Sequence, residues 1–251
     1  MASNKLVANP DKTGLLIIRA RGTAQQMQSI TLGGSTITEE TTHKVLGMTL
    51  NNRLTWNDHV YGLISSLNSK IGGLKRLSYH VPAPYMIPIA RATIVAKLRY
   101  GLGIYGAVRS TEHDSHCTMM NDLQVVLNNA MRLILNKRLS DKMKVEDLCN
   151  ESGFESINRM TAEEQIRIVW NARDNPNSPV LELFDRVSGG STWANTRGDL
   201  TTSARTSLAT QNLPHRAILT WNSTNEALRE AKNRRELRTR TRQFIKLLPI
   251  R

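Results

Sequence analysis

Residues 57–78 of the sequence read NDHVYGLISSLNSKIGGLKRLS, and this stretch decides the fold. Its apolar side chains recur three and four residues apart, at Val60, Leu63, Ile64, Leu67, Ile71 and Leu74. That spacing is typical of one face of an amphipathic α-helix. Before residue 57 the stronger pattern is alternation of apolar and polar residues, which is typical of strands. We therefore predict an α+β protein, in which a small N-terminal antiparallel β region is followed by a mainly α-helical region.

The N-terminal part carries short strand-like segments. Residues 15–18 form an apolar run, and residues 27–31 alternate before a Gly-Gly-Ser turn at 33–35. Residues 35–38 can return as a strand, and residues 45–50 are a further candidate strand. Short runs of this kind, bounded by glycine-rich turns, predict an antiparallel sheet. A sheet this small is marginal by itself and must pack on something.

The helical pattern continues beyond residue 78. Its periodicity predicts helices over about 82–105, 115–138, 145–149, 156–173 and 226–248. Pro88 lies early in the first of these, where proline should kink the helix. Gly, Ser, Thr and Asn dominate residues 187–212, so we expect a linker or a long loop there. The chain then divides into segments 1–56, 57–110, 111–186, 187–212 and 213–251.

The composition points to a polyanionic partner. The 251 residues carry a formal net charge of +13, and the isoelectric point is about 10.2. Such a balance favours nucleic acid, although a basic protein without that role has the same composition. Two cysteines make no disulfide framework. With neither a signal-peptide pattern at the N-terminus nor an apolar run long enough for a membrane span, we expect an intracellular, soluble protein.

The C-terminal forty residues hold the clearest charge pattern. They contain ten Lys or Arg and three Glu, a net charge of +7. On a helix, the residues that recur every four positions form one stripe: Arg234, Arg238, Arg242 and Lys246. Such a stripe could neutralise phosphates and release their counterions. A solvated helix face or a membrane-surface helix would show the same spacing.

A second basic group falls on the first two long helices. Its members are Lys70, Lys75, Arg76, Arg91, Lys97 and Arg99. Four tyrosines are interleaved with them: Tyr79, Tyr85, Tyr100 and Tyr105. Basic and aromatic side chains together suit a groove for a single strand or an RNA–DNA hybrid. The alternative is that the tyrosines are half-buried core and the charges are solvated.

No catalytic or metal site emerges from the residues themselves. His113, His116 and Cys117 cluster, yet no Cys-x-x-Cys pair accompanies them and the spacing matches no common zinc frame, so we assign no metal ligand. The sequence holds no nucleophile signature, phosphate-binding loop or dinucleotide motif. The residues alone therefore indicate binding without catalysis.

Three blocks of sequence resemble a known family. Asn9-Pro10-Asp11-Lys12-Thr13, before the apolar run, looks like the Asn-x-x-Lys-Thr segment of LINE-type (non-LTR, jockey-like) retrotransposon reverse transcriptases. Residues 44–50 (KVLGMTL) and 54–60 (LTWNDHV) resemble that family's Lys-Tyr-Leu-Gly motif and its Leu-x-Trp-x-x-His-Ile continuation, with Val45 in place of tyrosine. Residues 216–222 resemble its C-terminal Arg-Ala-x-x-x-Trp-Asn segment. The likeness spans nearly the whole chain.

The resemblance implies roles for matching positions. Residues 1–56 would be the end of the palm, 57–110 the thumb, 111–186 a helical connection and 213–251 a basic helical segment. Lys12 would assist the leaving pyrophosphate, unless it is a plain surface lysine. Lys44, Leu46 and Gly47 would form a primer-grip-like turn, although Gly47 could equally be a strand bulge. Trp56 and His59 would pack where palm meets thumb.

The resemblance also leaves activity uncertain. The family's Tyr-x-Asp-Asp motif is missing from this sequence. Nucleotidyl transfer needs metal ions held by carboxylates, so Mg²⁺ is expected only in a full-length polymerase and no cofactor in this chain. We expect a C-terminal fragment that binds RNA and DNA as template–primer but is inactive without the palm and fingers portion. The alternatives are a non-enzymatic basic helical RNA- or DNA-binding protein and a non-functional retroelement remnant.

Overall fold

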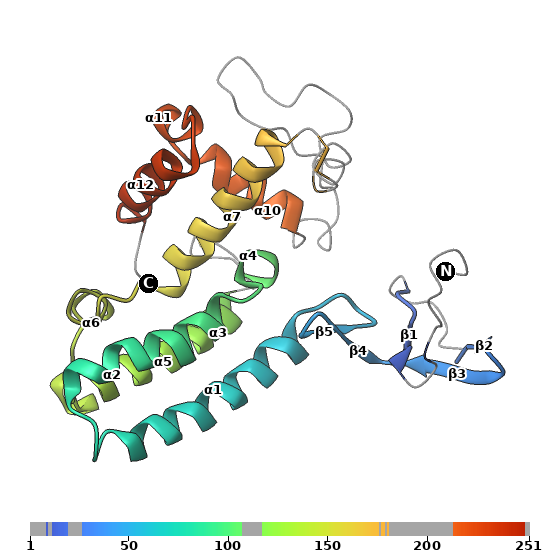
Figure 1. Cartoon of the computed structure of the whole chain (residues 1–251), viewed down its shortest axis with the longest axis horizontal. Helices are drawn as coiled ribbons and strands as arrows, with labels where there is room; N and C mark the ends of the chain where they lie inside the picture. The colour runs from blue at the N-terminus through green and yellow to red at the C-terminus, as the bar shows by residue number, and fades with distance from the viewer. Residues whose placement is uncertain are drawn as a thin grey trace. The chain divides into compact units, whose positions relative to one another are not determined.

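A computed structural model shows that the chain is α+β, with short strands near the N-terminus and helices after them (Figure 1). It describes residues 9, 12–19, 27–106, 117–175, 177–178, 180 and 213–248. The chain divides into two compact units, 1–65 and 66–251. No helix among the described residues is long and apolar enough to cross a membrane. The linker predicted for 187–212, and His113 and His116, lie outside the described residues.

The first unit begins with a three-stranded sheet. Its strands are β1 (Leu15–Leu16), β2 (Ser29–Leu32) and β3 (Ser35–Glu40), in the order β1-β3-β2. The pair β2–β3 is the antiparallel hairpin that the sequence predicts, and Gly33 and Gly34 turn it with φ of 59° and 85°. One pairing departs from the antiparallel expectation, because β1 runs parallel to β3. Glycine tolerates these left-handed angles, which explains why the turn falls there.

A second hairpin follows where the sequence predicts a single strand over 45–50. That prediction is wrong, since the segment folds as β4 (Thr42–Val45) and β5 (Met48–Asn51), paired antiparallel. Leu46 and Gly47 form the two-residue turn, with φ of 48° and 81°. Two consecutive positive φ angles are typical of the type I′ turn, whose twist matches that of the flanking strands. Gly47 is therefore a turn residue and not a bulge.

The chain enters α1 (Asn57–Leu77) through a polar contact made by Asn51. The side-chain amide nitrogen of Asn51 donates to Thr55 Oγ1 at 2.7 Å and to Asp58 Oδ2 at 2.8 Å. Its side-chain oxygen accepts from the Thr55 backbone nitrogen at 2.9 Å. Asn51 is buried, and a buried amide needs such partners. This one residue fixes the junction between β5 and α1.

After α1, whose second half lies in the second unit, comes a helix that contains Pro88. It comprises α2 (Ala83–Ala90), a π-helical turn η3 (Arg91–Val95) and α3 (Ala96–Arg99). Proline cannot donate an N–H within a helix, and the π turn directly after it is the distortion that results. Instead of continuing to Tyr105 as predicted, the helix ends at Tyr100 and Gly101. Gly101 has φ of 72°, and the separate α4 (Leu102–Tyr105) starts after it.

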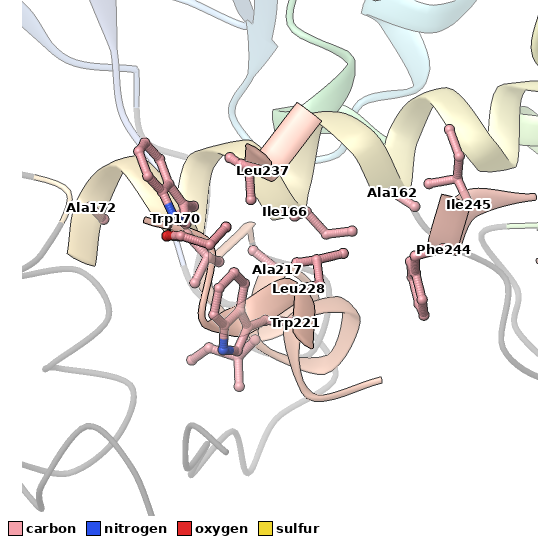
Figure 2. Close-up of a cluster of buried hydrophobic side chains, with 13 residues drawn as sticks. Ala162, Ile166, Trp170, Ala172, Ala217, Trp221, Leu228, Leu237, Phe244 and Ile245 are labelled. Carbon is pink, nitrogen blue, oxygen red and sulfur yellow. Dashed lines mark hydrogen bonds between the residues drawn. The ribbon is translucent and has the colours of Figure 1, made fainter. Parts of the chain in front are cut away.

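The longest described helices after them are α5 (Cys117–Ile134) and α7 (Ile157–Asp174), and Ser156 caps α7 by accepting from the Arg159 backbone nitrogen. The others are the 3₁₀ turn η4 (Leu139–Asp141), α6 (Val145–Ser152), α10 (Leu213–Asn222), α11 (Glu226–Arg229) and α12 (Arg234–Ile245). Helices α10 and α12 both pack against α7 (Figure 1). Their apolar side chains meet in one cluster around Trp170 and Trp221 (Figure 2). Trp170 Nε1 donates to the Ala231 carbonyl at 3.2 Å.

Two glycines let α4 lie directly on α7. A Cβ at Gly103 would come within 2.8 Å of Ile168 Cδ1, and one at Gly106 within 2.8 Å of Thr161 Cγ2. The Gly106 carbonyl accepts from Gln165 Nε2 at 3.2 Å and from Arg216 Nη1 at 3.2 Å. These buried bonds join α4, α7 and α10, so the C-terminal helices share a core with residues more than a hundred positions earlier.

The prediction of one basic helix over 226–248 is wrong in one respect, because this segment forms two helices, α11 and α12. Asn233 accepts from the Glu236 backbone nitrogen at 2.9 Å, and Glu236 Oε2 accepts from the Lys232 backbone nitrogen at 2.9 Å. This reciprocal arrangement resembles a capping box and starts a new helix at Arg234. The break allows α11 and α12 to pack on each other, as their contacts show.

Candidate nucleic-acid interface

Helix α12 presents two different faces. Its buried face holds Leu237, Thr241, Phe244 and Ile245, of which Leu237, Phe244 and Ile245 belong to the cluster on α7 (Figure 2). The other face carries the predicted stripe, here called the α12 row: Arg234, Arg238, Arg242 and Lys246. All four of its side chains are exposed. Because four residues rise about 6 Å along a helix, the row extends for about 18 Å.

The α12 row has no counterion among the residues that the structure describes. Within the described part of the chain no hydrogen bond or ion pair involves any of its four side chains, whereas the neighbouring Arg240 is held by Glu236 and by the Ala227 carbonyl. Like charges four residues apart on a helix repel each other. The row is therefore a line of exposed positive charge on a helix whose other face is buried in the core.

Other arginines nearby donate hydrogen bonds to backbone carbonyls of the protein. Arg159, which is buried, donates to the carbonyl of Lys246 at 2.8 Å and so caps the end of α12 from α7. Arg229 donates to the carbonyls of Asn222 at 2.8 Å and Thr224 at 3.0 Å. A guanidinium with several donors satisfies such helix-end carbonyls well. Their positive charges thus contribute to tertiary structure and are less available to an outside ligand.

Arg99 lies among charges from three elements. It forms ion pairs with Glu163 and, at 3.4 Å, with Glu164, while Arg167 also pairs with Glu164. Burial lowers the pKa of Arg99, and the positive charges of Arg167 and Arg238 act in the same direction, against the pull of Glu164. Arg99 is therefore held by carboxylates of α7.

The structure divides the predicted thumb-like group into two. Lys70, Lys75 and Arg76 are exposed on α1, with no side-chain partner among the described residues. Lys97 instead donates to Ser66 Oγ. Arg91 donates to the Gly153 carbonyl at 3.1 Å and lies 5.2 Å from the centre of the Phe154 ring. Lys97, Arg91 and Arg99 thus have intramolecular partners, while the first three project into solvent.

The four predicted tyrosines also separate. Tyr105 is fully buried, its hydroxyl donates to the Leu98 carbonyl at 2.8 Å, and burial raises its pKa. It is a core residue and lines no groove. Tyr79, Tyr85 and Tyr100 are exposed. None of the four is half-buried, because one is fully buried and three are exposed.

In the first unit, the primer-grip-like residues form the β4–β5 hairpin tip. Lys44 is exposed and pairs in register with Thr49, and the turn residue Leu46 is 81% exposed. His59 accepts from the Thr49 backbone nitrogen at 3.3 Å through Nδ1. Burial and the charge of Lys44 both lower the pKa of His59. The hairpin tip thus places an apolar side chain in solvent next to a basic one.

Trp56 and His59 lie close to each other in the first unit. His59 is buried and Trp56 is partly buried, with ring centres 6.3 Å apart in an edge-to-face arrangement. Lys12 lies at the surface after a turn in which its backbone nitrogen donates to Asn9 at 3.2 Å. Within the described residues no group of three His, Cys, Asp or Glu side chains could hold a metal ion.

Sequence reasoning missed two anchoring residues, Arg159 and Asn233. A local signal existed for Asn233, because Asn233 and Glu236 have the spacing of a capping box. No local signal existed for Arg159, whose partner lies 87 residues away. Comparisons with protein-family models, curated proteins and solved structures found no match for this chain.

Proposed function

We propose that this chain binds the sugar–phosphate backbone of nucleic acid, as the C-terminal part of a LINE-type retrotransposon reverse transcriptase. The observation that carries the proposal is the α12 row, a line of exposed cations without counterions among the described residues, on a helix whose other face packs on α7. The net charge of +13 and the sequence resemblance to the palm end and thumb of that family support it. Such a protein would work in the nucleus or cytoplasm, on template–primer.

Phosphate contacts explain why the row carries positive charge and little else. Arginine forms two parallel hydrogen bonds to a phosphate, and contacts of this type position a protein without reading bases. Each phosphate neutralised adds roughly 0.7–0.9 to the slope of log affinity against log salt concentration. Binding through the α12 row should therefore be strong at low salt and independent of sequence.

The decisive experiment removes the row and measures the salt dependence. Arg234, Arg238, Arg242 and Lys246 are changed together to alanine, and fluorescence anisotropy follows labelled RNA, DNA and hybrids across a salt series. The slope should fall by about 3. A matched control removes four other exposed charges through Arg53→Ala, Arg138→Ala, Lys142→Asn and Lys144→Ala, where asparagine suits the positive φ of residue 142. An unchanged slope in the row variant, or equal losses in both variants, would remove the basis of the proposal.

Polymerisation by this chain alone is not part of the proposal. The sequence holds no Tyr-x-Asp-Asp motif, and two-metal chemistry needs such carboxylates, so in the proposed full-length polymerase Mg²⁺ would be held by residues outside this chain. We expect no primer extension on a primed RNA template with magnesium or manganese. Reproducible extension by the purified protein, above a heat-inactivated control, would show that this view is wrong.

A second candidate is a non-enzymatic basic nucleic-acid-binding protein. The observation that favours it is that the second unit has its own hydrophobic core around α7. All residues of that core belong to the second unit. The two candidates differ in ligand preference. A polymerase thumb should bind primer–template hybrids more tightly than single strands, while a stand-alone binding protein should show no such preference. Anisotropy with matched hybrid and single-stranded probes separates them.

A further inference from the structure

The connection between α1 and α2 displays two unusually exposed tyrosines. Tyr79 is 76% exposed and Tyr85 is 64% exposed, more than any other aromatic side chain in the described part of the chain. Neither hydroxyl has a hydrogen-bond partner among the described residues. Aromatic rings usually bury 150–250 Å² each, so leaving two of them in solvent forgoes considerable stabilisation. Exposed aromatics that the fold does not use are candidates for ligand contact.

The backbone that carries this tyrosine pair, Tyr79 and Tyr85, is held in place. The nitrogens of His80 and Val81 donate to the Leu77 carbonyl at 2.9 and 3.0 Å, and the nitrogen of Tyr85 donates to the Pro82 carbonyl at 3.0 Å. Pro82 and Pro84 further restrict the backbone. A ligand that contacts the tyrosine pair would therefore bind a preorganised surface, which limits the entropy lost on binding.

The charges along the stretch of chain that holds the tyrosine pair all have one sign. Lys75 and Arg76 occupy the last turn of α1, and Lys70 lies one to two turns before it; all three are exposed. The sequence from His59 to Thr111 contains no Asp or Glu. A ligand that fits this connection must therefore combine a flat π surface with negative charge. An unpaired nucleotide provides both, because its base stacks on an aromatic ring while its phosphate meets the cations.

We propose that the α1–α2 connection is a stacking site for unpaired bases of single-stranded nucleic acid, formed by Tyr79 and Tyr85 and flanked by Lys75 and Arg76. The site differs in kind from the α12 row, which contacts phosphates only. Bases within a duplex are stacked on each other, so the site takes a single-stranded segment and not the double-stranded part. The inference rests on the proposed nucleic-acid function and adds which form of the ligand is held here.

The test compares a normal single-stranded oligonucleotide with an abasic one of equal length and charge. The unmodified protein should bind the normal strand about 5- to 150-fold more tightly for each stacked base. Changing Tyr79 and Tyr85 together to alanine should abolish that preference and leave the salt slope unchanged, because no charge is altered. Changing both to phenylalanine should keep the preference. As a control, Tyr61→Ala removes a different exposed tyrosine of α1 and should have no effect.

A complementary variant separates charge from stacking. Lys75→Ala with Arg76→Ala should flatten the salt slope by about 1.4–1.8 and keep the preference for bases. Salt-dependent binding without any preference for the normal strand would overturn the stacking site and leave the α12 row intact. The stacking site would also be overturned if Tyr79→Ala with Tyr85→Ala weakened binding of the normal and the abasic strand equally. Binding of an acidic polyglutamate peptide as tight as that of the normal strand would overturn it too. Complete absence of nucleic-acid binding would overturn both proposals.

Discussion

The α12 row should lower the stability of the protein while it raises affinity for nucleic acid. Changing Arg234 and Arg238 to alanine removes two pairs of like charges four residues apart, Arg234–Arg238 and Arg238–Arg242. Each such pair costs about 0.2–0.5 kcal/mol. Arg234 is also the first residue of α12, where a cation opposes the helix dipole at a cost of about 0.3–1 kcal/mol. The double variant should therefore be more stable by about 0.7–2 kcal/mol.

Binding should change in the opposite direction. Loss of two phosphate contacts should flatten the salt slope by about 1.4–1.8. Urea unfolding monitored by tryptophan fluorescence suits the stability measurement, because Trp170 and Trp221 lie in the cluster that α12 covers. Arg235→Ala is the matched control, since it removes an N-terminal cation that has no basic neighbour four residues on. It should stabilise by about 0.3–1 kcal/mol through the dipole alone.

High salt offers a second check on the same reasoning. At 1 M ionic strength the Debye length is about 3 Å, so the repulsion between the exposed arginines should be screened and the gain in stability should shrink. If Arg234→Ala with Arg238→Ala destabilises the protein by more than about 0.5 kcal/mol, these side chains contribute to the fold. In that case the row cannot be described as solvated charge that is held for a ligand.

Three further changes test the fold around the interface. Arg159→Ala should cost about 1.5–3 kcal/mol in denaturant unfolding, because it uncaps α12. Gly106→Ala should cost about 1–3 kcal/mol, because the new Cβ would clash with the Leu102 carbonyl oxygen and lie 2.8 Å from Thr161 Cγ2, whereas Gly72→Ala, which meets nothing within 4 Å, should be neutral or stabilising by up to about 1 kcal/mol. Burial lowers the pKa of His59, so its stabilising contribution is present above pH 6.5, its ordinary pKa, and is lost as pH falls below it; His59→Gln should lack that loss in unfolding measured across pH. Equal pH profiles for both proteins would contradict the last expectation.

Local sequence determined several features by itself. The apolar period of residues 57–77 is enough to place α1, because a helix repeats every 3.6 residues whatever surrounds it. Gly33 and Gly34 are enough to place the β2–β3 turn, since few other residues adopt two positive φ angles in succession. The spacing of Arg234, Arg238 and Arg242 likewise places them on one face. These features depend only on neighbours along the chain.

Local sequence was a poorer guide where two signals competed. Residues 45–50 alternate like a strand, yet Leu46 and Gly47 turn the chain, and the non-glycine Leu46 at positive φ hides that turn from residue preferences. The capping pair Asn233 and Glu236 interrupts a stretch whose overall composition is helical. In both places a specific backbone interaction outweighs a general tendency.

Only the tertiary structure decided which basic side chains are exposed without partners and which are held. Arg216 reaches the Gly106 carbonyl across 110 positions of sequence, and Arg159 reaches Lys246 across 87. Tyr105 and Tyr79 have the same side chain, but one is fully buried and the other is 76% exposed. Burial and hydrogen bonding depend on which distant segments meet, and the energy of a charge or a ring depends on that environment. The sequence therefore determined the charges and their local spacing, while the packing around α7 determined which of them remain for a ligand.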